Sequence, residues 1–143
     1  FSALVTQTWE QTLDAFPAEE IKLLKPPVLG VTSVAYIDAS GAVVTLPEAS
    51  YVLDAATGPG WLFPASGTSW PSTSAVINAV RIRFTAGFGP AATDVPAPIR
   101  QWLLLTIAYL HAQRESHDLA GKVTAIPNRF VDSLLDPYRQ YGL

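Results

Sequence analysis

The stretch Val95-Pro-Ala-Pro-Ile-Arg-Gln-Trp-Leu-Leu-Leu-Thr-Ile-Ala-Tyr-Leu-His-Ala-Gln-Arg-Glu115 decides the fold, because it is the one long helical pattern in a chain otherwise rich in short strand patterns. Pro98 suits the first turn of a helix, where its missing N–H is not needed, and Asp94 is placed to cap that turn. Apolar side chains occupy both faces of the helix predicted over residues 96–115, and a helix of this kind is normally buried on all sides.

A chain of 143 residues contains little protein with which to cover such a helix twice. We therefore expect a neighbouring subunit to supply part of the cover, through Trp102, Leu104, Leu105, Tyr109 and Arg114. Composition agrees with this interpretation, since only 15% of the residues are charged and 49% are hydrophobic, against a usual charged share of about 25%. The pattern is typical of a protomer that buries much of its surface in contacts.

The residues before this helix alternate between apolar and polar side chains in short runs separated by turns, which predicts β-strands. Asp38-Ala-Ser-Gly41 has the composition of a hairpin turn. The predicted strands cover residues 4–13, 21–24, 31–38, 43–46, 51–53, 61–63 and 76–86. In the last of them Val80, Ile82 and Phe84 share one face, and Arg81 and Arg83 share the other.

We predict an α+β fold for a single domain of residues 1–143: a small, mostly antiparallel β region (about 4–86), then a helical part (about 96–136) with a long buried helix and a shorter C-terminal one. The shorter helix starts at Pro127 and stops at Asp136, since a residue before proline disfavours helix. This leaves residues 137–143 as a C-terminal tail. No methionine is present, so we expect that the chain has lost its start and an N-terminal segment.

Two features allow more than one interpretation. Trp70 lies in the loop of residues 65–74, where a tryptophan either covers the edge of a core or contacts a partner, and we favour the first. Arg81 and Arg83 could meet phosphate, but in an acidic region we favour ion pairs at the surface or at an interface.

Patterns that carry chemistry are weak in this chain. Gly87-Phe-Gly89-Pro-Ala-Ala92 follows a strand as a dinucleotide fingerprint does, but Pro90 and the absence of a βαβ unit favour a plain turn. His111, Glu115, His117 and Asp118 match no established metal spacing and favour a solvated or interfacial helix end. We find no nucleophile elbow. We therefore expect no catalytic residues, no cofactor and no metal.

Charge and composition exclude several classes of protein. Net charge is −3, and residues 1–99 hold four Lys or Arg against eight Asp or Glu, so no basic stripe is available to grip nucleic acid. Cysteine is absent, which excludes disulfides and cysteine-bound zinc. No apolar run approaches the roughly 20 residues that a bilayer requires, so we expect no membrane association.

The order of several short motifs resembles one family. Val5-Thr-Gln-Thr-Trp9, Val31-Thr-Ser-Val-Ala-Tyr36, Val80-Arg-Ile-Arg-Phe-Thr-Ala-Gly-Phe-Gly89 and Val95-Pro-Ala-Pro-Ile-Arg-Gln101 occur in that order in it, followed by Leu134-Leu-Asp-Pro-Tyr-Arg139. The family is that of head-tail connector, or adaptor, proteins of tailed bacteriophages and gene transfer agents. The resemblance spans essentially the whole chain.

This resemblance implies a homo-oligomeric ring, commonly of twelve subunits, made in the bacterial host cytoplasm and located at the head-tail junction of a virion or virus-like particle. The ring would lie below the portal protein and carry a tail stopper or terminator protein, while DNA passes through as non-specific cargo. Members normally carry a further N-terminal helical segment, which could also cover the apolar helix. We expect the tail to dock into the portal through Pro137, Tyr138, Arg139, Tyr141 and Leu143.

Two other functions stay open at this stage. The first is a β-sandwich module of a phage tail or surface protein that binds carbohydrate or protein, for which Trp61 and Trp70 could form an aromatic platform. The second is a small hydrolase, supported only by generic carboxylates.

Overall fold

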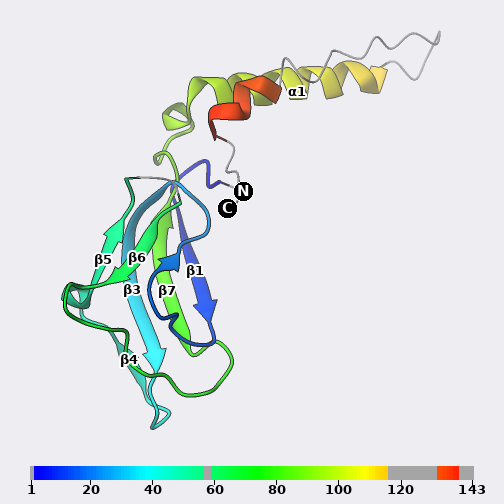
Figure 1. Ribbon diagram of the computed structural model, residues 1–143. Coiled ribbons are helices and arrows are strands. Elements are labelled where there is room, and N and C mark those ends of the chain that lie inside the picture. Colours follow the sequence, from blue (N-terminus) through cyan, green and yellow to red (C-terminus); the bar gives the residue numbers. More distant parts are fainter. Residues whose placement is uncertain (1, 57–58, 116–131, 139–143) are drawn as a thin grey trace. The chain divides into compact units, whose positions relative to one another are not determined.

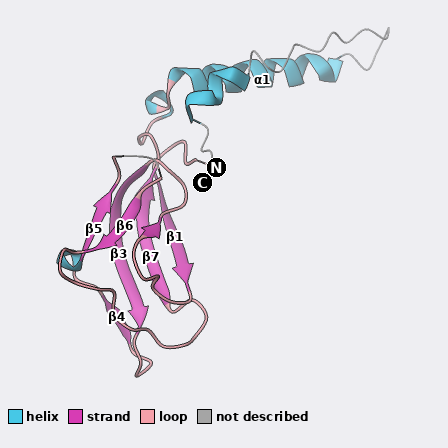
Figure 2. Cartoon of the chain, viewed as in Figure 1, coloured by secondary structure: helices cyan, strands magenta, loops and turns pink. Residues whose placement is uncertain are grey.

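The computed structural model describes residues 2–56, 59–115 and 132–138. The chain forms two compact units, one ending at Asp94 and the other beginning at Val95. Of the described elements, the strands lie in the first unit and the long helix lies in the second, as Figures 1 and 2 show. The antiparallel sheets and the long helix confirm the predicted α+β class.

The larger sheet of the first unit has four antiparallel strands in the order β1-β7-β3-β4. Their bounds are Gln7–Leu13 for β1, Val80–Ala86 for β7, Val28–Ile37 for β3 and Val43–Thr45 for β4. Strand β7 pairs along its whole length with both β1 and β3. It therefore forms the centre of the unit.

The smaller sheet has three antiparallel strands in the order β2-β6-β5. Their bounds are Ile21–Lys22 for β2, Trp61–Pro64 for β6 and Tyr51–Asp54 for β5. A short 3₁₀ helix, η1, spans Glu48–Ser50 ahead of β5, and a second, η2, spans Ala92–Asp94.

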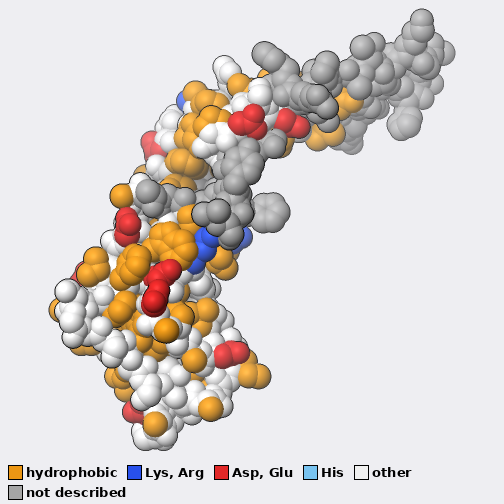
Figure 3. All heavy atoms as spheres, in the orientation of Figure 1, with side chains coloured by type: hydrophobic (Ala, Val, Ile, Leu, Met, Phe, Trp, Pro, Cys, Tyr) orange, Lys and Arg blue, Asp and Glu red, His pale blue; other side chains and the backbone are white. Residues whose placement is uncertain are grey.

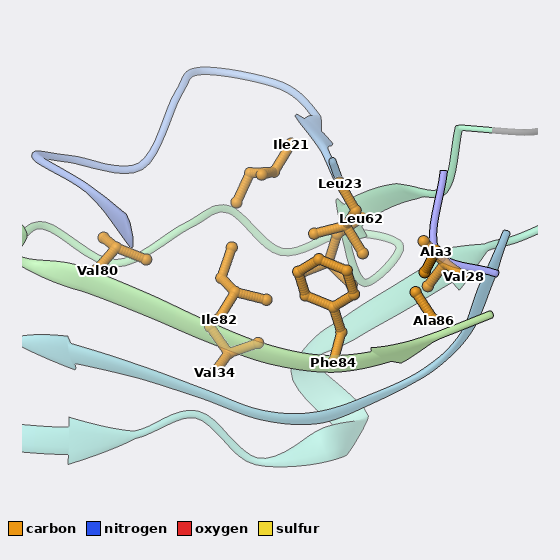
Figure 4. Close-up of a cluster of buried hydrophobic side chains, with 10 residues drawn as sticks. All are labelled: Ala3, Ile21, Leu23, Val28, Val34, Leu62, Val80, Ile82, Phe84 and Ala86. Carbon is orange, nitrogen blue, oxygen red and sulfur yellow. The ribbon is translucent and has the colours of Figure 1, made fainter. Parts of the chain in front are cut away.

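The core of the first unit lies between these two sheets. Ile82 and Phe84 of the large sheet and Leu62 of the small one are almost completely buried, and their side chains gather in one cluster (Figure 4). The predicted alternation of β7 is confirmed, because Arg81 and Arg83 point to the opposite, solvent-exposed face. The first unit is thus a small β-sandwich, an architecture that the sequence suggested only as the alternative.

Several strand boundaries predicted from the sequence are wrong: β1 begins at Gln7 and not at residue 4, β3 begins at Val28 and not at residue 31, and the largest difference is in β7. We expected a strand from residue 76, but β7 begins at Val80. Asn78 has a φ of 57°, which places it in the left-handed region that strands exclude. Its backbone N–H donates to Oδ1 of Asp14 at 2.9 Å instead of to a neighbouring strand.

The loop after β7 contains two glycines, Gly87 and Gly89, at positions where the chain approaches closely. Gly87 has a φ of 138°, and a Cβ there would lie 2.5 Å from the backbone carbon of Val5. The N–H of Phe88 donates to the carbonyl of Leu4 at 3.1 Å, and the N–H of Thr6 donates to the carbonyl of Gly89 at 2.8 Å. Gly87 therefore admits the chain's own N-terminal segment, whereas a Cβ at Gly89 would meet the side chain of Asp94. These two close approaches explain the pattern that resembled a dinucleotide fingerprint.

The second unit contains helix α1, Ala97–Glu115, and a short 3₁₀ helix, η3, Ser133–Tyr138. The predicted long helix is confirmed. The predicted stop at Asp136 is wrong, because η3 continues through Pro137 to Tyr138. The fixed φ of proline, near −65°, is compatible with 3₁₀ geometry. Within the described residues, no helix combines the length and apolar character needed to cross a membrane.

Candidate interaction surfaces

Helix α1 presents one side to the short helix η3. Trp102, Leu103, Thr106 and Tyr109 are half-buried and share that side. The indole Nε1 of Trp102 donates to Oδ1 of Asp132 at 3.3 Å, just before η3. The hydroxyl of Thr106 donates to the carbonyl of Trp102 at 2.8 Å, which satisfies its polar group within the helix.

The remaining surface of α1 is exposed, and it carries several large apolar side chains beside the polar residues Arg100, Gln101 and His111. The exposed fractions are 66% for Leu104, 46% for Leu105, 60% for Ile107 and 57% for Leu110. Leu104, Ile107 and Ala108 lie on one stripe at helical spacing, on the side away from Trp102 and Thr106. We call Leu104, Ile107 and Ala108 the α1 stripe. Among the described residues of the second unit, η3 therefore covers one side of the long helix and leaves the Leu104 side exposed.

The predicted contact residues fall into different surroundings. Leu104 and Leu105 are exposed, whereas Trp102 and Tyr109 are half-buried. Arg114 lies in the last turn of α1, and its side chain is outside the described residues. Their role in subunit contact stays a prediction.

The predicted tail, residues 137–143, is described only in its first two residues. Pro137 and Tyr138 belong to η3 and so are not part of a separate tail. Arg139, Tyr141 and Leu143 are outside the described residues. Docking of this segment also stays a prediction.

The outer face of the four-stranded sheet carries two arginines, which the sequence assigned to ion pairs. Nε of Arg83 lies 2.7 Å from Oε2 of Glu10, on the neighbouring strand. Arg81 is exposed, and the described part of the chain offers it no ion pair. Together with Ser33, Ala35 and Val43, these residues line a shallow, open hollow of about 180 Å³. Val43 is 73% exposed.

The outer face of the three-stranded sheet is a second surface, and sequence reasoning missed it. Val52 is 55% exposed and lies opposite Phe63, which is 37% exposed. Asp54 lies opposite Trp61 on the same face, and Nζ of Lys22 lies 5.5 Å from the centre of the Trp61 ring. Figure 3 shows hydrophobic side chains gathered over β6. The sequence did carry a signal for this surface: Val52 and Phe63 are apolar residues at positions of their strands that face outward.

The polar cluster at the end of α1 gives no metal site in the part of the chain that is described. Among residues 2–56, 59–115 and 132–138, no three His, Asp or Glu side chains come together to hold an ion. His111 is exposed on α1. His117 and Asp118 are outside the described residues.

We compared the chain with known protein families, curated proteins and solved structures. No family model and no curated protein matches the chain. A chain from the virion of a native gene transfer agent particle has a TM-score of 0.76 and 24% identity, with 99% of this chain and 69% of that chain covered. A chain from the neck of an empty particle, computed with C6 symmetry, has a TM-score of 0.74 and 27% identity over the same shares.

A third similar chain comes from the neck of a native gene transfer agent particle computed with C12 symmetry. Its TM-score is 0.67 and its identity 23%, and the alignment covers 99% of this chain and 74% of that one. The similarity therefore extends over both units of this chain. The resemblance drawn from the sequence is confirmed, and the chain has the fold of a head-tail connector-type protein of a gene transfer agent.

Proposed function

We propose that this chain is a structural adaptor that forms a ring below the portal of a phage-like particle, joins the DNA-filled head to the tail and lets DNA pass. The observation that carries this proposal is the match of nearly the whole chain to chains from the virion and neck of gene transfer agent particles. The C6 and C12 symmetries of those necks support a ring of identical subunits. The role is structural and requires no catalytic residue.

The exposed apolar side of α1 supplies the subunit contact in this proposal. Leu104 and Leu105 together with Ile107 would leave water when a neighbouring subunit covers them. Full burial of such a side chain contributes about 1.5–3 kcal/mol, so these partly exposed side chains would each contribute a fraction of that. Trp102 and Tyr109, already half-buried, would lie at the edge of this contact, and Arg114 would extend it toward the end of the helix.

The C-terminal residues supply the contact with the portal. Tyr and Arg are enriched at the centres of protein interfaces, and Tyr138, Arg139 and Tyr141 bring three of them into one short segment, with Pro137 and Leu143 beside them. A tail stopper or terminator protein would bind the opposite end of the ring. Neither of these two contact regions would bind DNA, since the chain is acidic overall and has no basic stripe.

Mass measurement of the full-length protein, alone and mixed with purified portal, tests this proposal. We expect a complex whose mass equals the portal ring plus one ring of this chain, and particles made without the chain should contain DNA-filled heads without tails. Normal yields of joined particles in its absence would overturn the proposal.

A truncation tests the docking segment separately. Removal of residues 139–143 leaves η3 intact, so the protein should fold but should not be retained on filled heads. Gln140→Ala, in the same segment, is the matched control and should behave as the wild type. If the truncated protein joins heads to tails at normal yield, the segment has no docking role.

The alternative function is a β-sandwich binding module for carbohydrate or protein. It is favoured by the two packed sheets of the first unit and by Trp61, which is only half-buried on the outer face of β6. Binding to a panel of immobilised glycans, lost in Trp61→Ala, would support it over the adaptor role.

A further inference from the structure

We propose that the outer face of the four-stranded sheet binds the outer face of the three-stranded sheet of a second copy, with Arg81 paired to Asp54 of that copy. The inference rests on the proposed ring and names a contact between its subunits. It is independent of the α1 stripe, which lies in the other unit.

Arg81 provides the cationic half of this contact. It stands on β7 beside Arg83, but among the described residues Glu10 pairs with Arg83, at 2.7 Å, and not with Arg81. The hollow around Arg81 is lined by Ala35 and by Val43, which is 73% exposed. A guanidinium next to apolar groups can bind a carboxylate whose neighbours are also apolar, because the lower dielectric under apolar cover strengthens the attraction between the two charges and a bidentate hydrogen-bonded geometry offsets their desolvation.

Asp54 provides the anionic half. It is exposed on β5, an edge strand, and no cation pairs with it among the described residues. Val52 and Phe63 lie beside it on the same face and are 55% and 37% exposed. Lys22 lies on the same face, with its Nζ 5.5 Å from the centre of the Trp61 ring. This face therefore presents one carboxylate, one ammonium over an aromatic ring and an apolar patch, and the carboxylate and the patch complement the arginine and valine of the hollow.

The occupant is a second copy because the two faces belong to opposite sides of one sandwich. Arg81 and Asp54 point away from the common core, so they cannot meet within one chain. In a cyclic ring each subunit uses two different patches, one for each neighbour. Two complementary faces on opposite sides of a unit meet this requirement, and the related necks have cyclic symmetry.

Charge reversal in assembled particles tests the pairing. Arg81→Glu and Asp54→Arg should each lower the yield of tailed particles at least about tenfold, since a like-charge pair at an interface costs more than about 1.4 kcal/mol. The double variant should restore most of the yield. Glu19→Lys, an exposed charge reversal on neither face, is the control and should have no effect. Folding of each variant is checked by circular dichroism.

Cross-linking gives a second readout that does not depend on yield. The chain contains no cysteine, so the Val43→Cys/Val52→Cys variant carries the only reactive thiols. A short thiol-reactive cross-linker should convert it, in particles, into a ladder of multimers, whereas Val43→Cys with Glu19→Cys should give none.

The two tests separate this inference from the proposed function. If the chain is absent from particles, the adaptor role fails. If it is present but the double charge variant is no better than the single ones and no ladder forms, the adaptor role stands and this contact is wrong. Loss of DNA retention in Arg81→Glu with normal assembly would also overturn the contact.

Discussion

The indole ring of Trp70 stacks on the phenyl ring of Phe16, with centroids 4.9 Å apart and an angle of 2° between the planes. Nε1 of Trp70 also donates to the backbone carbonyl of Glu19 at 2.7 Å. Both rings pack against the buried core of the sandwich. The preferred interpretation of Trp70, as cover for the edge of a core, is therefore confirmed.

Trp70→Ala should lower the free energy of unfolding by more than about 2 kcal/mol: about 1 from the ring pair, about 1 from the hydrogen bond, and a further loss from the apolar surface that the half-buried ring covers. Trp70→Phe keeps the stacking and should lose roughly half as much. Urea denaturation followed by circular dichroism measures both. A Trp70→Ala protein of unchanged stability that fails to assemble would instead make Trp70 a partner contact.

Gly87→Ala should destabilise the first unit by more than about 1 kcal/mol, because the native φ suits only glycine and the added Cβ meets backbone atoms. That Cβ would lie 2.5 Å from the carbonyl carbon of Val5 and 2.6 Å from the nitrogen of Thr6. Gly67, with a φ of 76° and nothing within 4 Å of its Cβ position, is the matched control. Thermal unfolding should show a clearly larger loss at Gly87; equal losses at both positions would mean that the close approach does not matter.

The parts of the fold that local pattern determines were predictable. The β7 alternation and the 97–115 helix follow from the spacing of apolar residues, and the 38–41 turn follows from Asp38 and Gly41. The start of β7 was not predictable, because Val76 and Ile77 have strand-like side chains, whereas the strand start is set by the left-handed φ of Asn78 and its long-range hydrogen bond to Asp14.

The candidate surfaces were predictable in part. The apolar pattern of α1 indicated that it needs a cover, and Leu104 and Leu105 are indeed exposed in the single chain. The packing of the two sheets into a sandwich depends on residues far apart in sequence, such as Leu62 and Phe84, which belong to one buried cluster. Without that arrangement, the outward face of Val52 and Phe63 could not be identified.

The hairpin turn should make stability depend on pH in the acid range. The Asp38 carboxylate accepts hydrogen bonds from the hydroxyl and N–H of Ser40, at 2.6 and 2.8 Å, and from the N–H of Ala42, at 3.0 Å. The Ser40 hydroxyl, followed by these backbone groups, holds the pKa of Asp38 below its usual 3.8. A lowered pKa gives stabilisation that is present above pH 3.8 and is lost as the pH falls through the folded-state value.

Asp38→Asn should therefore have a lower thermal midpoint than the wild type near neutral pH, and the difference should shrink as the pH falls below 3.8. Parallel melting curves of the two proteins across this range measure it. A constant difference down to the lowest pH would show that the charge of Asp38 is not involved.

Duplex DNA should bind weakly and without sequence preference. Residues 1–99 contain eight acidic side chains against four basic ones, so few phosphates can be neutralised and few counterions released. Fluorescence anisotropy with several labelled duplexes, at two salt concentrations, measures affinity and selectivity. A specific complex tighter than about 10⁻⁸ M at physiological salt lies in the range of true sequence readers and would contradict the role of DNA as cargo.

Leu104→Glu should abolish assembly without unfolding the chain. Leu104 is 66% exposed, so a glutamate there is solvated in the single chain, whereas in a dry subunit contact its unpaired charge costs several kcal/mol. Leu105→Glu, at 46% exposure, should act in the same direction. Ser66→Glu places the same charge at an exposed position in the loop after β6, outside α1, and serves as the control. Circular dichroism should show folded protein in all three cases, and particle yield should fall only for the leucine variants. Normal tailed particles from Leu104→Glu would mean that the α1 stripe stays in water and that the ring closes through other surfaces.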